Sequence, residues 1–135
     1  MAHLQKSIAT LRVFGDSLIP NEVTRLLGGE ATEATKKGEL IRRPSGDFIA
    51  KHGSWRLKAP ECEPENLDHQ VSWLLGQLTD NLEVWQVLGK EFKIDLFCGL
   101  FMGSSNEGFS LAAATMVALG ARGIEIGFDL YDPSE

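Results

Sequence analysis

The chain contains segments in which apolar residues recur at every second position, the spacing of a strand with one buried face. The segment "IATLRVF" at 8–14 shows this alternation, and "IEIGFDLYD" at 124–132 shows it most strictly. The segment "KIDLFCGLFM" at 93–102 is apolar on both faces, which is typical of a strand in the middle of a sheet. We therefore predict three strands, and we expect the last of them to be half-buried.

Other segments have apolar residues three and four positions apart, which indicates helices. In "PNEVTRLLGG", Pro20 suits the first turn of a helix, and either of the two final glycines can be the left-handed residue that ends it. Ser110 is a candidate N-cap for a second helix, "LAAATMVAL", which would end at Gly120 or Gly123. Each of these two helices follows one predicted strand and precedes another.

A longer helical pattern begins at Leu67 and continues to Gly89. Asp80 and Glu83 have the spacing of a capping box, which marks the start of a helix. The pattern is compatible with one continuous helix or with two. We expect a long helix, a turn close to Asp80, and a short second helix that ends at Gly89.

Two β-like runs in the first half, "ELIRR" at 39–43 and "FIAKHGSWRLKA" at 48–59, flank the sequence "PSGD". The residue types of "PSGD" are typical of hairpin turns. In the second run, the inward face would hold Trp55, Leu57 and Ala59, and the outward face Ser54, Arg56 and Lys58. We predict an antiparallel hairpin with one solvated face.

The predicted order is β α β β α β α β, with a break possible in the third helical segment. This order indicates an α+β fold: a two-layer sandwich of a mixed or antiparallel sheet of about five strands with helices on one face. A ferredoxin-like topology is compatible with it. At 135 residues we expect a single domain over 1–135, with a flexible N-terminal tail at 1–7.

Composition and local patterns exclude several classes of protein. The chain is 43% hydrophobic and 24% charged, which is ordinary for a soluble globular protein and excludes a disordered chain. No apolar run approaches the twenty residues of a membrane span, and the N-terminus has no apolar core of signal-peptide length. Cys62 and Cys98 have no CxxC spacing, so we expect reduced thiols, no zinc site and a cytoplasmic protein.

The charge of −6 is unevenly distributed along the chain. Residues 1–60 carry ten Lys and Arg against six Asp and Glu, whereas residues 61–135 carry three against thirteen. Overall acidity argues against nucleic-acid binding, because neutralising phosphates requires a basic face. The asymmetry is compatible with an anionic partner for the first half, a cationic partner for the second, or attraction between the two halves.

Basic residues concentrate on and beside the predicted hairpin. We take Arg42, Arg43, Lys51, His52 and Arg56 as candidates for binding an anion or a partner. Arginine forks bind carboxylate and phosphate groups through two parallel hydrogen bonds, so a convergent group of them would suit an acidic ligand. The alternative is a solvated sheet edge whose charges prevent unwanted strand pairing. Neighbouring strand residues alternate between faces, so these side chains cannot all converge.

No pattern of residues indicates catalysis, a metal or a cofactor. The histidines, among them His52 and His69, lack metal-ligand spacing, and no phosphate-binding glycine motif is present. A Cys98–His52 pair would depend on tertiary structure, and a cysteine on an apolar strand is usually part of the core. Glu125 and Asp129 share a strand face and could hold a hard cation, but such alternation is also typical of a strand with one wet face.

The chain resembles a known family along most of its length. The set of motifs comprises "ATLRVFGDSLIPNEVTRLLG", "GSWRL", "NLDHQVSWLLGQL", "FKIDLFCGLFM" and "GFSLAAATMVALGARGIEIGFDLYD". Together they resemble the family catalogued as domain of unknown function 4279, over roughly residues 8–133. The resemblance implies a small, soluble, mostly bacterial α+β domain, and it carries over no catalytic residues.

Two function classes follow from these observations. The first is a non-catalytic module that binds a protein partner or a second copy of itself, through the basic hairpin or the acidic C-terminal strand. The second is a small-molecule or anion-binding domain, or an enzyme, with a pocket that joins His52 or His69 to Asp95 or Asp129. We expect no cofactor, no nucleic acid and no membrane partner for either class.

Overall fold

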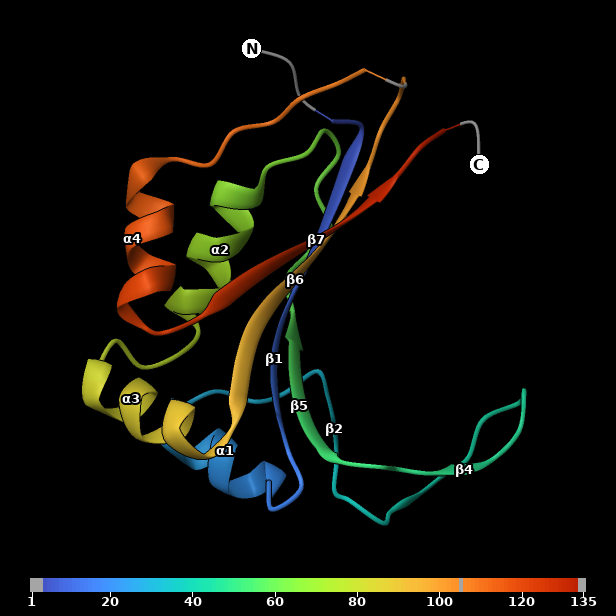
Figure 1. Cartoon of the computed structure of the whole chain (residues 1–135), viewed down its shortest axis with the longest axis vertical. Helices are drawn as coiled ribbons and strands as arrows, with labels where there is room; N and C mark the ends of the chain where they lie inside the picture. Colours follow the sequence, from blue (N-terminus) through green and yellow to red (C-terminus); the bar gives the residue numbers. More distant parts are fainter. Residues whose placement is uncertain (1–3, 105, 134–135) are drawn as a thin grey trace.

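The computed structural model describes residues 4–104 and 106–133, and it confirms the α+β class with a mixed sheet (Figure 1). The strands are β1 (Lys6–Gly15), β2 (Glu33–Thr35), β3 (Leu40–Ile41), β4 (Phe48–Ile49), β5 (Gly53–Lys58), β6 (Lys93–Phe101) and β7 (Glu125–Tyr131). The helices are α1 (Pro20–Leu27), α2 (Leu67–Gly76), α3 (Leu82–Glu91) and α4 (Ala113–Ala121). They lie together on one face of the sheet (Figure 1).

The main sheet has five strands in the order β2-β5-β1-β6-β7. β1 is antiparallel to both β5 and β6, and β6 is parallel to β7, to which α4 connects it. β2 runs parallel to β1 because both are antiparallel to β5, which lies between them. The chain therefore contains one split β-α-β unit, built around α1, and one continuous β-α-β unit, built around α4.

One face of the sheet carries the core and the other is open. On β1 the residues Ser7, Ala9, Leu11 and Val13 are buried against the helices, and those between them are half-buried on the opposite face. The predicted inward positions Trp55, Leu57 and Ala59 are all buried, which confirms their orientation. Alternate residues of a strand point to opposite faces, so Arg56 and Lys58 lie on the open face.

The predicted hairpin differs from the structure. β3 and β4 form a separate two-stranded sheet, which we name the β3–β4 arm, and it projects from the body of the molecule (Figure 1). The long run 48–59 is interrupted before Gly53, where the backbone packs closely: a Cβ there would stand 2.8 Å from the carbonyl oxygen of Gly15 and 2.9 Å from Leu18. The unpredicted strand β2 takes the place beside β5 that we expected for 39–43.

Two helices of ten residues each, α2 and α3, confirm the predicted turn, but the second helix is as long as the first and ends at Glu91 rather than at Gly89. The turn between them is held at Thr79, whose N–H donates to the carbonyl of Leu27 at 2.7 Å. The carbonyl of Thr79 accepts from the indole Nε1 of Trp85 at 2.9 Å. The N-cap of α3 is Asn81 rather than Asp80, because the Asn81 side chain accepts the N–H of Glu83.

Of three other expectations at the ends of elements, one is confirmed and two change. The first helix ends at Gly28, which has a φ of +77°, in agreement with the prediction. The N-cap of α4 is Ala112 rather than Ser110. In the expected tail at 1–7, Leu4 is buried and β1 begins at Lys6, while residues 1–3 lie outside the described residues. None of the described helices is long and apolar enough to cross a lipid bilayer.

The last strand is less buried than its alternating sequence predicts. Ile124 is buried and Ile126 is half-buried, but Phe128 and Leu130 are 43% and 57% exposed. β7 is an edge strand, so it has a neighbouring strand on one side only.

Candidate functional site

A cleft of about 430 Å³ lies between the β3–β4 arm and the β2–β5 end of the sheet. It is lined by Glu33, Thr35, Arg43, Phe48, Ile49, Ala50, Lys51, His52, Ser54 and Arg56. The arm supplies one wall, the turn between β4 and β5 supplies the end, and the open face of β2 and β5 supplies the floor. The split of the predicted hairpin into an arm and a sheet strand is therefore what forms the cleft.

Four of the five candidate binding residues line this cleft. Arg43 follows β3, Lys51 and His52 stand in the turn after β4, and Arg56 points from β5 onto the open face. Arg42 is exposed on the arm and does not line the cleft. The cleft thus brings together cationic side chains that are up to thirteen positions apart in sequence.

Positive charge exceeds negative charge in the cleft. Among the described lining residues, Glu33 is the one carboxylate, against Arg43, Lys51 and Arg56. Glu33 accepts from Nη2 of Arg43 at 3.3 Å and stands opposite Arg56 across β2 and β5. One carboxylate cannot neutralise three cations, so the cleft favours an anionic ligand.

Aromatic rings support the two guanidinium groups. Arg43 lies over the ring of Phe48 at 5.1 Å, and Arg56 lies over the ring of Phe14 at 5.7 Å. Such stacking orients the plane of the guanidinium group and leaves its edge free to donate hydrogen bonds. On the floor, the hydroxyls of Thr35 and Ser54 are 3.1 Å apart and share a hydrogen bond.

The cleft continues into a transverse row of charged residues on the open face. The strand registers align Glu33, Arg56, Arg12, Asp95 and Glu125 in this row, from β2 to β7. Arg12 binds both carboxylate oxygens of Asp95, at 2.8 and 2.7 Å, and these hydrogen bonds raise the pKa of Arg12 above its usual value. The charge of Arg12 is matched inside the fold, whereas the excess positive charge remains in the cleft.

The alternative site residues are not brought together. His52 lies in the cleft at one edge of the sheet, and His69 is exposed on α2, on the helix side. Asp95 is paired with Arg12, and Asp129 on the far edge strand accepts the hydroxyl of Tyr131 at 2.8 Å. Glu125 and Asp129 share the open face of β7, as their spacing predicts.

The two cysteines are free thiols with different surroundings. Cys98 is buried on the helix side of β6, and burial raises its pKa to about 12. Cys62 is half-buried, and loss of hydration also raises its pKa. A thiol with a raised pKa is a poor nucleophile near neutral pH, so neither cysteine has the properties of a catalytic thiolate.

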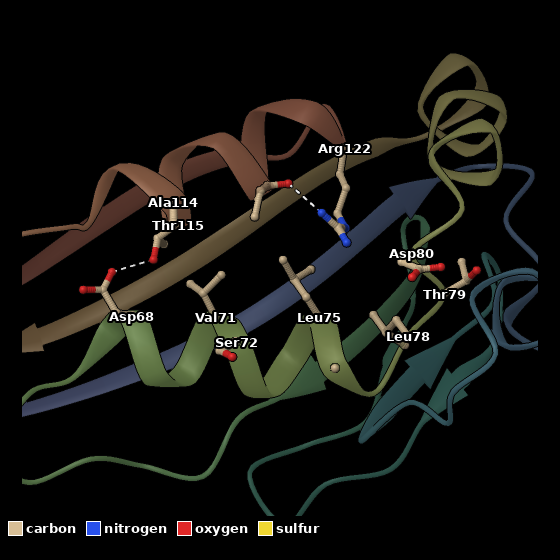
Figure 2. A pocket seen from close by; sticks show the side chains of 12 residues that line it. Asp68, Val71, Ser72, Leu75, Leu78, Thr79, Asp80, Ala114, Thr115 and Arg122 are labelled. Carbon is tan, nitrogen blue, oxygen red and sulfur yellow. Dashed lines mark hydrogen bonds between the residues drawn. The ribbon is translucent and has the colours of Figure 1, made fainter.

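A second, wider groove of about 700 Å³ lies between α2 and α4 (Figure 2). Asp68 of α2 accepts the N–H of Ala112 at 3.0 Å and the hydroxyl of Thr115 at 2.6 Å. At the other end, Arg122 donates to the carbonyl of Ala118 at 3.0 Å. These groups cap the two ends of α4, which explains why α4 needs no side-chain cap of its own.

Sequence reasoning missed Glu33 and Thr35, the residues that β2 contributes to the cleft. β2 is three residues long, and Ala34 is its one apolar residue, so it has no alternation to detect. It also missed Phe48 and Ile49 as cleft walls, because their position depends on where the arm leaves the sheet.

The profile of the family described as "Domain of unknown function (DUF4279)" matches residues 5–133. The chain belongs to this family. The matched region contains every strand and helix described above, so the arm and the cleft lie within the family domain. No curated protein and no solved structure has significant similarity to the chain.

Proposed function

We propose that the protein is a non-catalytic binding module that receives an acidic segment of a partner protein in the cleft beside the β3–β4 arm. The observation that carries this proposal is the excess of cations in the cleft, where Arg43, Lys51 and Arg56 face one carboxylate, Glu33. Carboxylates of the partner would accept from the guanidinium groups and complete the pairing that Glu33 leaves incomplete.

The arm supports a protein partner in particular. Leu40, Phe48 and Ile49 are 46%, 46% and 55% exposed, which is unusual for large apolar residues on so short a segment. Apolar and aromatic side chains next to arginine are typical of the centre of protein interfaces. The partner segment would place apolar side chains against the arm and carboxylates against the floor of the cleft.

The net charge of −6 opposes the approach of an acidic partner, so attraction must come from the local cations. The arginines that line the cleft are partly exposed, and salt screens such charges. Binding is therefore expected to weaken as the salt concentration rises, and the apolar contacts with the arm to persist.

A peptide-binding assay tests the proposal. The probe is a fluorescein-labelled peptide of alternating Glu and Leu, and its control has Gln in place of Glu. We expect saturable binding of the Glu peptide by the parent protein. The double variant Arg43→Gln/Arg56→Gln should bind it at least tenfold more weakly, because charged hydrogen bonds contribute roughly 1.5–3 kcal/mol each. The control variant Arg42→Gln should bind it as the parent protein does. Equal binding of both peptides, or an equal effect of Arg42→Gln, would overturn the proposal.

A small anion is the second candidate ligand, because the volume of about 430 Å³ lies within the range of small-molecule sites. Pyrophosphate and citrate, added as competitors in the same assay, separate the two. A partner segment anchored on the arm is displaced weakly by either anion. Tight binding of one anion, with no binding of the peptide, would assign the cleft to a small molecule.

We place this binding activity in the cytoplasm of a bacterial cell. Two features support the assignment: Cys62 and Cys98 are unpaired thiols, as is usual in reducing compartments, and the sequence resembles a mostly bacterial family.

A further inference from the structure

A second surface of the molecule, at the opposite edge of the sheet, has unmatched apolar side chains and unpaired backbone groups. It consists of α4 and the outer edge of β7, and we name it the α4–β7 edge. In Figure 1, β7 begins beside the C-terminal end of α4 and crosses over β6 in this view, and the strand order places it at the edge of the sheet. It is separate from the cleft, which lies at the β2–β5 edge.

The helix of this edge is apolar on the side that faces water. α4 has the sequence "AATMVALGA" and contains no charged residue, and Met116 and Val117 are 54% and 69% exposed. A helix on the surface of a monomer usually has a polar outer face, and a helix that is apolar all round is usually buried. The sequence of α4 is thus that of a covered helix, although the described residues leave Met116 and Val117 exposed.

Met116, on the exposed side of α4, points toward the edge of the sheet where β7 lies. Thr115 and Leu119 are buried against the body, and Ala114 and Ala118 line the groove next to α2. Residues four apart share a helix face. By this periodicity, Met116 lies on the side away from α2, toward the edge of the sheet.

The strand of this edge has free hydrogen-bonding groups. The carbonyl of Tyr131 accepts the N–H of Met102 at 3.0 Å and therefore points toward β6. Backbone groups alternate in direction along a strand, so those of Ile126, Phe128 and Leu130 point outward. Within the described residues, no strand pairs with this side of β7. An edge strand with outward-pointing backbone groups can serve as a template for pairing with another strand.

We infer that the α4–β7 edge binds a second copy of the same chain, with the two β7 strands pairing antiparallel about Phe128 to form one continuous ten-stranded sheet. This register pairs all seven residues of β7. Phe128 pairs with Phe128 of the second copy, and Ile126 pairs with Leu130, so the residues with outward backbone groups oppose one another.

The positions of the carboxylates select the same register. When the pairing is centred on Phe128, Glu125 lies opposite Tyr131 of the second copy, and Asp129 lies opposite Gly127. No carboxylate then lies directly opposite another carboxylate. A shift of the centre by one residue, to Gly127, sets Glu125 opposite Asp129, and a shift to Asp129 sets that residue opposite itself. Like charges directly opposite each other destabilise a strand pair.

The two-fold arrangement also brings the two α4 helices to the same side of the extended sheet. Met116 of each copy then points toward the symmetry axis. One contact therefore covers both the strand edge and Met116, the residue of α4 that points toward that edge, and no partner binding in the cleft would do so.

Gly127 offers a matched pair of variants that tests the register. A Cβ at Gly127 meets no atom within 4 Å, and the residue has no positive φ, so the fold accepts a side chain there. In the proposed dimer that side chain faces Asp129 of the second copy. Gly127→Lys adds two attractive cross-strand pairs per dimer, and Gly127→Asp adds two repulsive ones.

Sedimentation velocity from low micromolar to submillimolar protein measures the effect, with thermal unfolding as the check on folding. We expect a concentration-dependent dimer, about threefold to tenfold tighter for Gly127→Lys and weaker by a similar factor for Gly127→Asp. A monomer throughout the range overturns the dimer. If both Gly127 variants change the dimer affinity alike, the proposed register is wrong. If Phe48→Ser abolishes the dimer, self-association belongs to the arm instead.

Discussion

Arg12 and Asp95 face each other directly across β1 and β6 on the open face of the sheet, joined by two hydrogen bonds of 2.8 and 2.7 Å. The guanidinium group lies over Phe14 at 4.9 Å and over Phe97 at 4.8 Å. The pair is partly shielded from water, with side chains 25% and 12% exposed. It therefore neutralises the centre of the open face and separates the cationic cleft from the acidic β7.

A double-mutant cycle measures the strength of this pair. We expect Arg12→Ala and Asp95→Ala to show a coupling free energy of about 1 kcal/mol or more, because the geometry is bidentate and partly buried. The control cycle uses Arg25 and Glu22, an exposed pair at 2.6 Å, for which we expect about 0.5 kcal/mol or less. Chemical unfolding supplies both values, and equal coupling in the two cycles would contradict the account.

The buried hydrogen bonds between Gln70 and Ser7 join α2 to β1. Gln70 accepts the hydroxyl of Ser7 at 2.6 Å and donates to the carbonyls of Ser7 and Pro60, both at 3.0 Å. Gln70→Leu removes these bonds and leaves the buried Ser7 hydroxyl without its acceptor, so we expect the protein to lose about 1–3 kcal/mol of stability. Gln86→Leu on exposed α3 is the control, with an effect within about 0.5 kcal/mol. Urea unfolding that finds the two variants equally stable refutes the prediction.

The buried thiol of Cys98 makes stability depend on alkaline pH. Its pKa is about 12 in the folded protein and roughly 8.5 when unfolded, so the unfolded chain loses the proton first. The contribution of the protonated Cys98 thiol to the stability of the folded protein is fully present below about pH 8.5. It declines as the pH rises toward the pKa of the folded state. We expect the unfolding free energy of Cys98→Ala to fall less steeply above this pH than that of the parent protein, by up to about 1.4 kcal/mol per pH unit.

Thiol labelling gives an independent check of the same residue. Cys98 in the folded protein should resist a thiol reagent, and unfolding in urea should make it reactive; Cys62→Ser removes the other thiol from the measurement. Rapid labelling of folded Cys62→Ser protein would be inconsistent with the burial of Cys98.

Tyr131 is the one tyrosine of the chain, so its ionisation can be followed by ultraviolet absorbance. Its hydroxyl donates to Asp129 at 2.8 Å, and this hydrogen bond to a carboxylate raises its pKa above the usual value. We expect Asp129→Asn to lower that pKa, because the negative charge that opposes ionisation is removed. Glu91→Gln, with the same change of charge on α3, should leave it unaltered. A pKa unaffected by Asp129→Asn would disprove the contact.

The extent to which sequence predicts this fold differs from element to element. Strict alternation of apolar residues predicted β1 and β7. Pro20 and Gly28 predicted the two ends of α1, because these signals are local in the sequence. The start of α4 depends on Asp68, which is more than forty positions away in sequence, so no local pattern indicates it. β2 is too short to show a period, and it forms because β5 offers it an edge.

The candidate site was also predictable only where its signals are local. Sequence identified the basic residues but assigned them to a hairpin face, since it could not show that the run 48–59 divides between an arm and a sheet strand. That division depends on the close packing of Gly53 against Gly15 and Leu18, a tertiary contact. The convergence of Arg43, Lys51, His52 and Arg56 on one cleft is a consequence of it.

Titration of the protein with the Glu–Leu peptide, followed by nitrogen–proton correlation spectra, tests the central claim most directly because it locates the bound segment. The account predicts chemical-shift changes at the backbone amides of Thr35, Phe48, Ser54 and Arg56, and none on α2 or α4. Changes confined to the groove between α2 and α4, or spread evenly over the surface, would contradict the assignment of binding to the cleft.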